Sequence, residues 1–167
     1  MEFIKKAQAT AESRSNAVRE TVHKLLEDIE TGREPAVREL ARKFDNWDGD
    51  FILGEEKKAR LIASVPERVK DDIRFAHEQV RAFALAQRES LREFVVENIP
   101  GARLGQRVVP MDVAGCYVPG GRFAHACSAL MSVATAKAAG VPFVIASSPP
   151  RGASIGPAMA FAMDHAG

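Results

Sequence analysis

Residues 113–147 read VAGCYVPGGRFAHACSALMSVATAKAAGVPFVIAS, and this stretch decides the fold. It opens with a short apolar run, Val113–Val118, that ends in Pro119-Gly120-Gly121. Residues 125–140 then have the apolar spacing of a helix, and Phe143–Ser147 is a second apolar run. Strand, glycine turn, helix and strand in this order are typical of a parallel β-α-β unit. Because parallel strands are buried on both faces, these runs are expected to be apolar without alternation.

The pattern continues beyond the second strand. Residues 154–166 again have helical spacing, and Gly167 stands where a glycine commonly ends a helix. A further strand is needed to complete the crossover and to cover the open sheet edge beside Phe143–Ser147. The predicted fold class is α/β, with an N-terminal helical segment followed by the first part of an open parallel sheet.

Charge divides the chain into two unlike parts. Residues 1–100 carry 38 of the 45 charged side chains, whereas residues 101–167 carry seven charges but nine of the twelve glycines. Such a shift marks a change of architecture. We predict an N-terminal arm at 1–15, a helical segment with a terminal hairpin at 16–112, and the start of a truncated α/β domain at 113–167.

The charged part begins with two expected helices. The first has an apolar stripe made by Val18, Val22, Leu25, Leu26 and Ile29. Ser15 or Asn16 can cap its start, and Gly32 stands at its C′ position. Pro35 then opens a second helix, where proline is tolerated in the first turn.

Two more helices and a hairpin follow. A short helix is expected at Glu55–Ser64, and a longer one from Pro66 to about Leu91. The runs FVVENI and LGQRVVP are strand-like, and Pro100-Gly101 between them predicts a β-hairpin.

Composition excludes several classes of partner. The formal net charge is +1, which gives neither the footprint of a nucleic-acid-binding protein nor a reason to expect a membrane surface as partner. Cys116 and Cys127 cannot build a disulfide framework, so a cytoplasmic location is expected. The N-terminus lacks the apolar core of a signal peptide, and no stretch approaches the roughly 18 apolar residues of a membrane span.

The turn Tyr117–Gly121 is the strongest candidate for ligand binding. Ligands of open parallel sheets bind beyond the carboxyl ends of the strands, and the following helix offers free N–H groups to a phosphate. Tyr117 is placed to stack on a cofactor or hydrogen-bond to it. Ser128, or Ser132 if the helix starts later, could add a hydroxyl group.

This turn departs from the dinucleotide fingerprint G-x-G-x-x-G. Gly120 and Gly121 are adjacent, no third glycine follows at the expected place, and no acidic residue lies about twenty positions on to hold a ribose. The alternative interpretation is that Pro-Gly-Gly only turns the chain.

Other chemically capable residues are scattered. Arg122 could pair with a phosphate or remain a solvated loop residue, and Cys116 inside an apolar run is most simply a core residue. His125 and Cys127 lack the further ligands that a metal site needs. The remaining histidines lie within helical patterns and are expected to be half-buried or surface residues: His23, His77 and His165.

Residues 113–150 resemble the histidinol dehydrogenase family. Its members carry a Y-V/I-P-G-G turn, a small-residue helix with L-M and A-K-x-A-G, and then a strand followed by S/T-P-P. Two upstream stretches, TGREPAVRELARKFDNWDG and VPERVKDDIRFAHEQVRAFALAQ, are similar to the family's G-D-x-A-l-x-e-x-t-x-x-F-D segment and to its long helix ending in a-F-H-x-x-Q. The resemblance covers essentially the whole chain from about Ala17.

This resemblance implies a homodimeric, zinc-requiring enzyme that oxidises an amino alcohol to the acid in two NAD-linked steps. It implies NAD contact at Tyr117, with Gly120 and Gly121 matching the glycines of the same turn. It also implies that residues 113–167 are the truncated start of a Rossmann-like NAD-binding domain, whose parallel sheet is the first part of an incomplete Rossmann-like sheet. The sequence Arg-Phe-Ala-His at 122–125 is more similar to relatives that oxidise sulfopropanediol, a sulfonated diol.

The family's zinc ligands and its catalytic Glu-His pair lie later than the matching segment, so no catalytic or metal-binding residue is assigned here. We expect the N-terminal portion of a histidinol dehydrogenase-type oxidoreductase, which serves histidine biosynthesis in a true histidinol dehydrogenase, inactive by itself. The alternatives are a sulfopropanediol 3-dehydrogenase-like portion and, in another class, a non-catalytic nucleotide-binding or dimerisation remnant.

Overall fold

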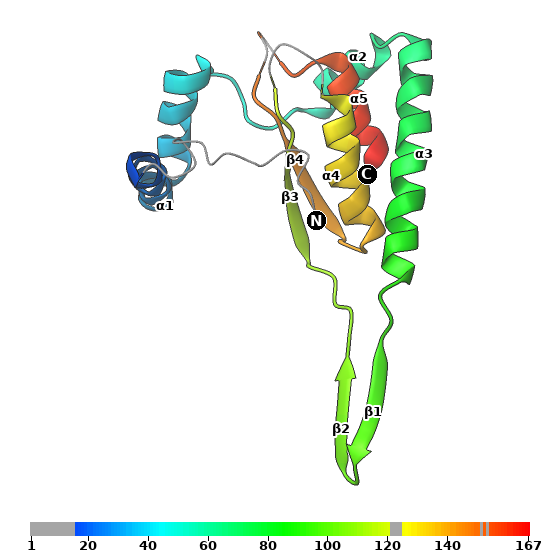
Figure 1. The fold of residues 1–167 in the computed structure, drawn as a ribbon. Helices are drawn as coiled ribbons and strands as arrows, with labels where there is room; N and C mark the ends of the chain where they lie inside the picture. The colour runs from blue at the N-terminus through cyan, green and yellow to red at the C-terminus, as the bar shows by residue number, and fades with distance from the viewer. Residues whose placement is uncertain (1–15, 121–124, 151, 153) are drawn as a thin grey trace, which may run out of the picture. The chain divides into compact units, whose positions relative to one another are not determined.

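The structure, a computed structural model, describes residues 16–120, 125–150, 152 and 154–167 (Figure 1). The chain divides into two compact units, one up to Gly49 and the other from Asp50 onward. The first unit contains α1 (Asn16–Asp45). The second contains α2 (Glu55–Ala63), α3 (Glu67–Glu89), β1 (Phe94–Ile99), β2 (Ala102–Gln106), β3 (Val113–Tyr117), α4 (Ala126–Ala138), β4 (Phe143–Ser147) and α5 (Pro157–Ala166).

Helix α1 is broken where two helices were predicted to meet. Arg33 has non-helical angles, φ 53° and ψ −140°, directly after Gly32, where the first helix was predicted to end. Gly32 is also needed for space, because a Cβ there would lie 2.8 Å from the Cβ of Ala36. The helix on the far side of the break contains Pro35, as expected, whereas Ser15 lies outside the described residues.

The core of the second unit is formed around α4. Figure 1 shows α4 between the β3–β4 sheet and α3, and α5 packs against α2, α3 and α4. Small and branched side chains of α4 and α5 fill the interior, together with the residue that follows β3: Val118, Ala129, Leu130, Val133, Ala134, Phe161 and Ala162. Elements from both sides of residue 112 thus share one core. The domain boundaries expected at residues 15 and 112 stay predictions.

Strands β3 and β4 are parallel, in register from Val113 opposite Phe143 to Tyr117 opposite Ser147. Helix α4 connects them and packs on one face, which confirms the predicted β-α-β unit and the α/β class. The expectation that both faces are buried is met on one face only. Within the described residues of the second unit, no helix packs on the other face, where Val113, Tyr117, Phe143 and Ile145 are exposed.

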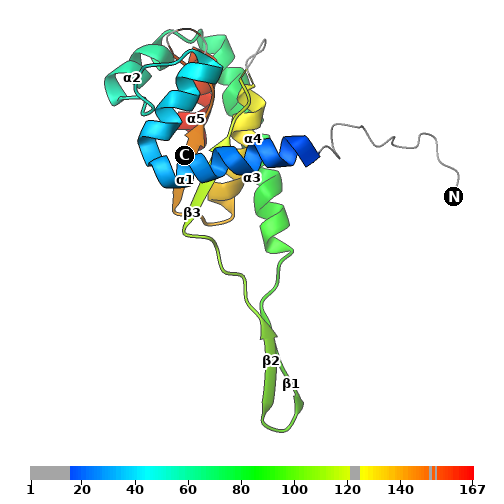
Figure 2. The same cartoon turned by 90° about the vertical axis from the view of Figure 1, so that its left-hand side faces the viewer.

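The predicted hairpin is present as β1 and β2, with Gly101 at φ +85° in its turn. Strand β2 ends at Gln106, earlier than the run LGQRVVP predicted. It ends there because Gln106 pairs with Phe94, the first residue of β1. Every residue of the two strands is exposed, and Figure 2 shows no helix alongside them.

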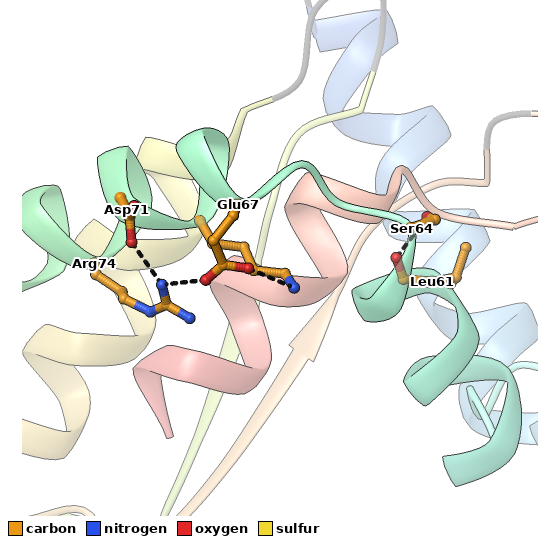
Figure 3. A network of polar contacts seen from close by, with 6 residues as sticks. Leu61, Ser64, Glu67, Asp71 and Arg74 are labelled. Atoms are coloured by element: carbon orange, nitrogen blue, oxygen red, sulfur yellow. Dashed lines mark hydrogen bonds and ion pairs between the residues drawn. The ribbon is translucent and has the colours of Figure 1, made fainter.

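Polar contacts order the corner between α2 and α3 (Figure 3). The Ser64 hydroxyl donates to the carbonyl of Leu61 at 2.7 Å, and α3 begins after Pro66. The carboxylate of Glu67 accepts hydrogen bonds from Arg74 at 2.8 Å and from Lys70 at 3.3 Å, and these bonds lower the pKa of Glu67. An acidic side chain in the first turn of a helix is favourable, although screening by water limits the gain at this exposed position.

Two further contacts join elements that are distant in sequence. Lys58 of α2 forms ion pairs with Glu55 and Asp164 at 2.9 Å each, which raise its pKa and connect α2 to α5. The Arg88 guanidinium of α3 donates to the carbonyl of Ala138 at 3.1 Å, which places a cation at the C-terminus of α4. None of the helices in the described ranges has the length and apolar character to cross a membrane.

Candidate functional site

The carboxyl ends of β3 and β4 bring the predicted site residues to one edge. Tyr117 and Ser147 are the last paired residues of the sheet, and the N–H of Val118 donates to the carbonyl of Ser147 at 2.8 Å. Tyr117 is 68% exposed, whereas the next residue, Val118, is 0% exposed. The alternation of the strand therefore buries Val118 in the core and directs the Tyr117 ring to the open face.

Gly120 holds the turn against the loop that follows β4. A Cβ at Gly120 would lie 2.6 Å from Cγ of Pro149 and 3.3 Å from its carbonyl oxygen. Glycine is required here because of this close approach, since its φ is not in the left-handed region. The other glycine of the predicted site, Gly121, and Arg122 lie outside the described residues.

The first turn of α4 follows the candidate turn along the chain. The carbonyl of His125 accepts hydrogen bonds from the N–H groups of Ser128 at 3.0 Å and Ala129 at 3.3 Å. Helix geometry leaves the first N–H groups, those of Ala126 and Cys127, without an intrahelical acceptor. Because α4 begins at Ala126, Ser128 is in its first turn. Ser132 lies further along the helix, where its hydroxyl donates to the carbonyl of Ser128 at 2.8 Å.

The sequence around this edge contains no acidic residue between Asp112 and Asp164. Asp112 precedes β3 and is therefore at the opposite end of the strand from Tyr117. The positive end of the helix dipole and the free N–H groups favour an anionic group over a cation at the N-terminus of α4.

Sequence reasoning missed the loop after β4, which reads Ser147-Ser148-Pro149-Pro150. The Oγ atom of Ser148 is buried, and among the described residues it has no hydrogen-bond partner. The signal was available in principle, because the carboxyl ends of neighbouring parallel strands lie at one edge of a sheet. A turn after the first strand therefore implies a facing loop after the second.

The other residues considered in the sequence analysis are explained by packing and side-chain pairing within the fold. Cys116 is buried in β3, as predicted, and the exposed His23 lies 3.2 Å from Glu27. The rings of His77 and His165 meet edge to face with centroids 4.8 Å apart. Burial lowers the pKa of His77, and so do His165 and Arg81. Within the described part of the chain, no three His, Cys, Asp or Glu residues are grouped so that they could hold a metal ion.

The structure defines an α/β protein with a candidate ligand-binding edge at the carboxyl ends of a parallel sheet. A family model described as histidinol dehydrogenase matches residues 8–167. The chain is 46% identical to sulfopropanediol 3-dehydrogenase of Ruegeria pomeroyi, over 97% of this chain and 38% of that protein. It is 36% identical to histidinol dehydrogenase of Methanococcus maripaludis, over 87% of this chain and 34% of that protein.

A solved structure has the same fold. The crystal structure of histidinol dehydrogenase from Elizabethkingia anophelis superposes with a TM-score of 0.81 at 22% identity, covering 98% of this chain and 36% of that one. The chain belongs to the histidinol dehydrogenase family, a family of dehydrogenase-type oxidoreductases. It spans only part of its relatives' length: 38% of the sulfopropanediol 3-dehydrogenase and 40% of a histidinol dehydrogenase homolog of Shouchella clausii, to which it is 44% identical.

Proposed function

We propose that this segment supplies the nucleotide-binding side of an NAD-linked, histidinol dehydrogenase-type enzyme, which oxidises an alcohol to a carboxylate in two steps. One observation carries the proposal: Tyr117 is exposed at the carboxyl end of a parallel strand, in a turn packed on the loop after the neighbouring strand. In a family of dehydrogenases, this edge is the expected position for the cofactor.

Each residue of the edge has a role in this proposal. The Tyr117 ring stacks on the nucleotide or hydrogen-bonds to it, and the first-turn N–H groups of α4 attract a phosphate. Gly120 keeps the turn closed against Pro149, and Gly121 is assigned from the sequence pattern alone. NAD, when bound, accepts a hydride in each of the two oxidations, so that one alcohol consumes two NAD⁺.

Zinc does not fit the residues described in this chain. No group of three candidate ligands is present among them, so we derive no step through zinc and place its site elsewhere in the intact enzyme. We therefore expect this chain alone to be inactive as a dehydrogenase. The homodimer and the cytoplasmic location also belong to the intact enzyme in this proposal.

Titration of the purified chain with NAD⁺ by calorimetry tests the binding role. We expect measurable heat from the unaltered chain, a strong loss with Tyr117→Ala, and partial retention with Tyr117→Phe, which keeps the aromatic ring. If Tyr117→Ala binds as well as the unaltered chain, the assignment of the YVPGG turn is wrong. No binding by any variant would favour a dimerisation remnant instead.

A second measurement tests the expected inactivity. The purified chain, incubated with histidinol, NAD⁺ and zinc, is followed at the absorbance of NADH. We expect no production above that of the heat-denatured chain. Sustained NADH formation would contradict the inference that the catalytic residues lie outside this segment.

A sulfonated diol is the second candidate substrate. Its support is the higher identity to the sulfopropanediol enzyme, 46%, compared with 36% for the archaeal histidinol dehydrogenase. The sequence Arg-Phe-Ala-His at residues 122–125 points the same way. The intact enzyme containing this segment should then show a higher kcat/KM for sulfopropanediol than for histidinol, and the opposite order would favour histidinol.

A further inference from the structure

Ser147 shares the open face with Tyr117. The two residues are directly paired in the parallel register, and both are exposed. Neighbouring strands lie about 4.8 Å apart, so paired side chains on one face are adjacent. The Ser147 hydroxyl therefore stands beside the base of the Tyr117 side chain at the edge of the sheet.

The position of Ser147 relative to the candidate turn is fixed by backbone contacts on both sides. Its carbonyl accepts the hydrogen bond of the Val118 N–H at 2.8 Å, so that its backbone is held directly against the residue after Tyr117. Two residues further on, Pro149 fills the space beside Gly120. These contacts fix the backbone from which the Ser147 side chain extends, so binding a ligand there requires little further ordering of the backbone.

The chemistry of the hydroxyl suits a nucleotide. A serine hydroxyl both donates and accepts, so it can bind a ribose hydroxyl or a phosphate oxygen. The N-terminus of α4, which follows the candidate turn along the chain, carries the positive end of the helix dipole and favours an anionic ligand. The neighbouring Ser148 differs from Ser147, because its hydroxyl oxygen is buried.

We propose that Ser147 is a second binding residue of the nucleotide site, and that its hydroxyl hydrogen-bonds to the part of NAD held against Tyr117. This inference rests on the proposed function, since it names a further residue of the same site. It extends the site from the YVPGG turn to the loop after β4, which the sequence pattern did not assign.

Calorimetric titration with NAD⁺ of Ser147→Ala and Ser147→Thr tests this inference. One net hydrogen bond corresponds to about a fivefold change in affinity, so we expect Ser147→Ala to bind about fivefold more weakly. Ser147→Thr keeps the hydroxyl and should retain most of the affinity. The matched control is Ser90→Ala at the end of α3, where the hydroxyl donates to the carbonyl of Gln87, and it should bind as the unaltered chain does.

The outcomes separate this inference from the proposed function. If the unaltered chain binds NAD⁺ and Tyr117→Ala weakens binding, while Ser147→Ala does not, the role of Ser147 is refuted and the function stands. Equal losses in Ser147→Ala and Ser147→Thr would refute a hydroxyl contact. If the unaltered chain does not bind NAD⁺ at all, the proposed function falls, and the role of Ser147 falls with it.

Discussion

The antiparallel ladder β1–β2 and the parallel ladder β3–β4 are built from similar apolar residues but have opposite environments. Helix α4 covers one face of β3–β4, where Cys116 is buried and Val118, the residue that follows β3, is fully enclosed. All residues of β1–β2 are exposed, including Phe94 and Leu104. An isolated two-stranded hairpin is marginally stable in water, so burial and not strand regularity is what should distinguish the two ladders energetically.

The comparison is tested most severely by opening a cavity under the parallel ladder. Leu130 of α4 is 1% exposed, and Leu130→Ala should lower the free energy of unfolding by about 3 kcal/mol through lost burial and an unfilled cavity. Urea denaturation followed by circular dichroism measures this change. The control is Met131→Ala on the same helix, 63% exposed, which should change the free energy by less than about 0.5 kcal/mol. Similar losses for both variants would mean that α4 does not pack as described.

A smaller effect is expected from filling the space at the candidate site. Gly120→Ala places a Cβ against the rigid ring of Pro149 and should lower the free energy of unfolding by about 1–3 kcal/mol. Gly115→Ala, within β3 itself, meets nothing within 4 Å and is the matched control. Thermal denaturation of the two variants compares them. An unaffected Gly120→Ala would show that the turn and the loop after β4 are not in contact.

A still smaller effect concerns pH and the packing of α3 on α5. The pKa of His77 is lowered from its ordinary 6.5 in the folded chain, so the unfolded chain binds a proton more readily. The contribution of His77 therefore leaves the free energy of unfolding unchanged above pH 6.5 and lowers it as the pH falls below 6.5. The charge of Glu78 partly opposes the lowering of the His77 pKa. His77→Phe keeps a ring against His165 and should reduce the loss of stability between pH 7 and pH 5 in urea titrations. An identical pH dependence in both proteins would argue against this cause.

The smallest effect is expected in the hairpin. Leu104 of β2 is 57% exposed, and Leu104→Ala should change the free energy of unfolding by less than about 0.5 kcal/mol. Urea denaturation at two protein concentrations measures this change. A loss as large as that of Leu130→Ala, dependent on concentration, would show that the hairpin is buried against a second copy of the chain. The contrast between the two ladders would then hold only for the single chain.

Local chemistry explains why much of the fold is readable from the sequence. Prolines and glycines mark the boundaries: Pro66 precedes α3, Gly101 turns the hairpin, and Pro157 begins α5. Local patterns do not show the space around a residue. The first helical stretch ends next to Gly32, as predicted, but the close approach of Ala36 that requires a glycine there is visible only in the structure, and the unusual angles fall on Arg33.

The candidate site was predictable on one strand and not on the other. Tyr117 and Gly120 follow from the glycine turn after β3, although their NAD contact stays a prediction. Ser147 and Pro149 could not be assigned without the register that pairs Tyr117 with Ser147. Register depends on contacts between segments about thirty residues apart, which local patterns do not specify. The uncovered face of β3–β4 is a similar case, because an apolar run does not reveal what packs on it.

Gly140 follows α4 and lies close to both ends of the segment that contains the β1–β2 hairpin. A Cβ at this position would be 3.9 Å from the guanidinium of Arg88, which precedes the hairpin, and 3.7 Å from Pro110, which follows it. The two ends of the segment that contains the hairpin are therefore close to the same residue. The closure entropy of such an excursion grows only with the logarithm of its length, by about 0.6 kcal/mol for each doubling. The hairpin can therefore lengthen or shorten in related chains with little effect on the α-helical and parallel core.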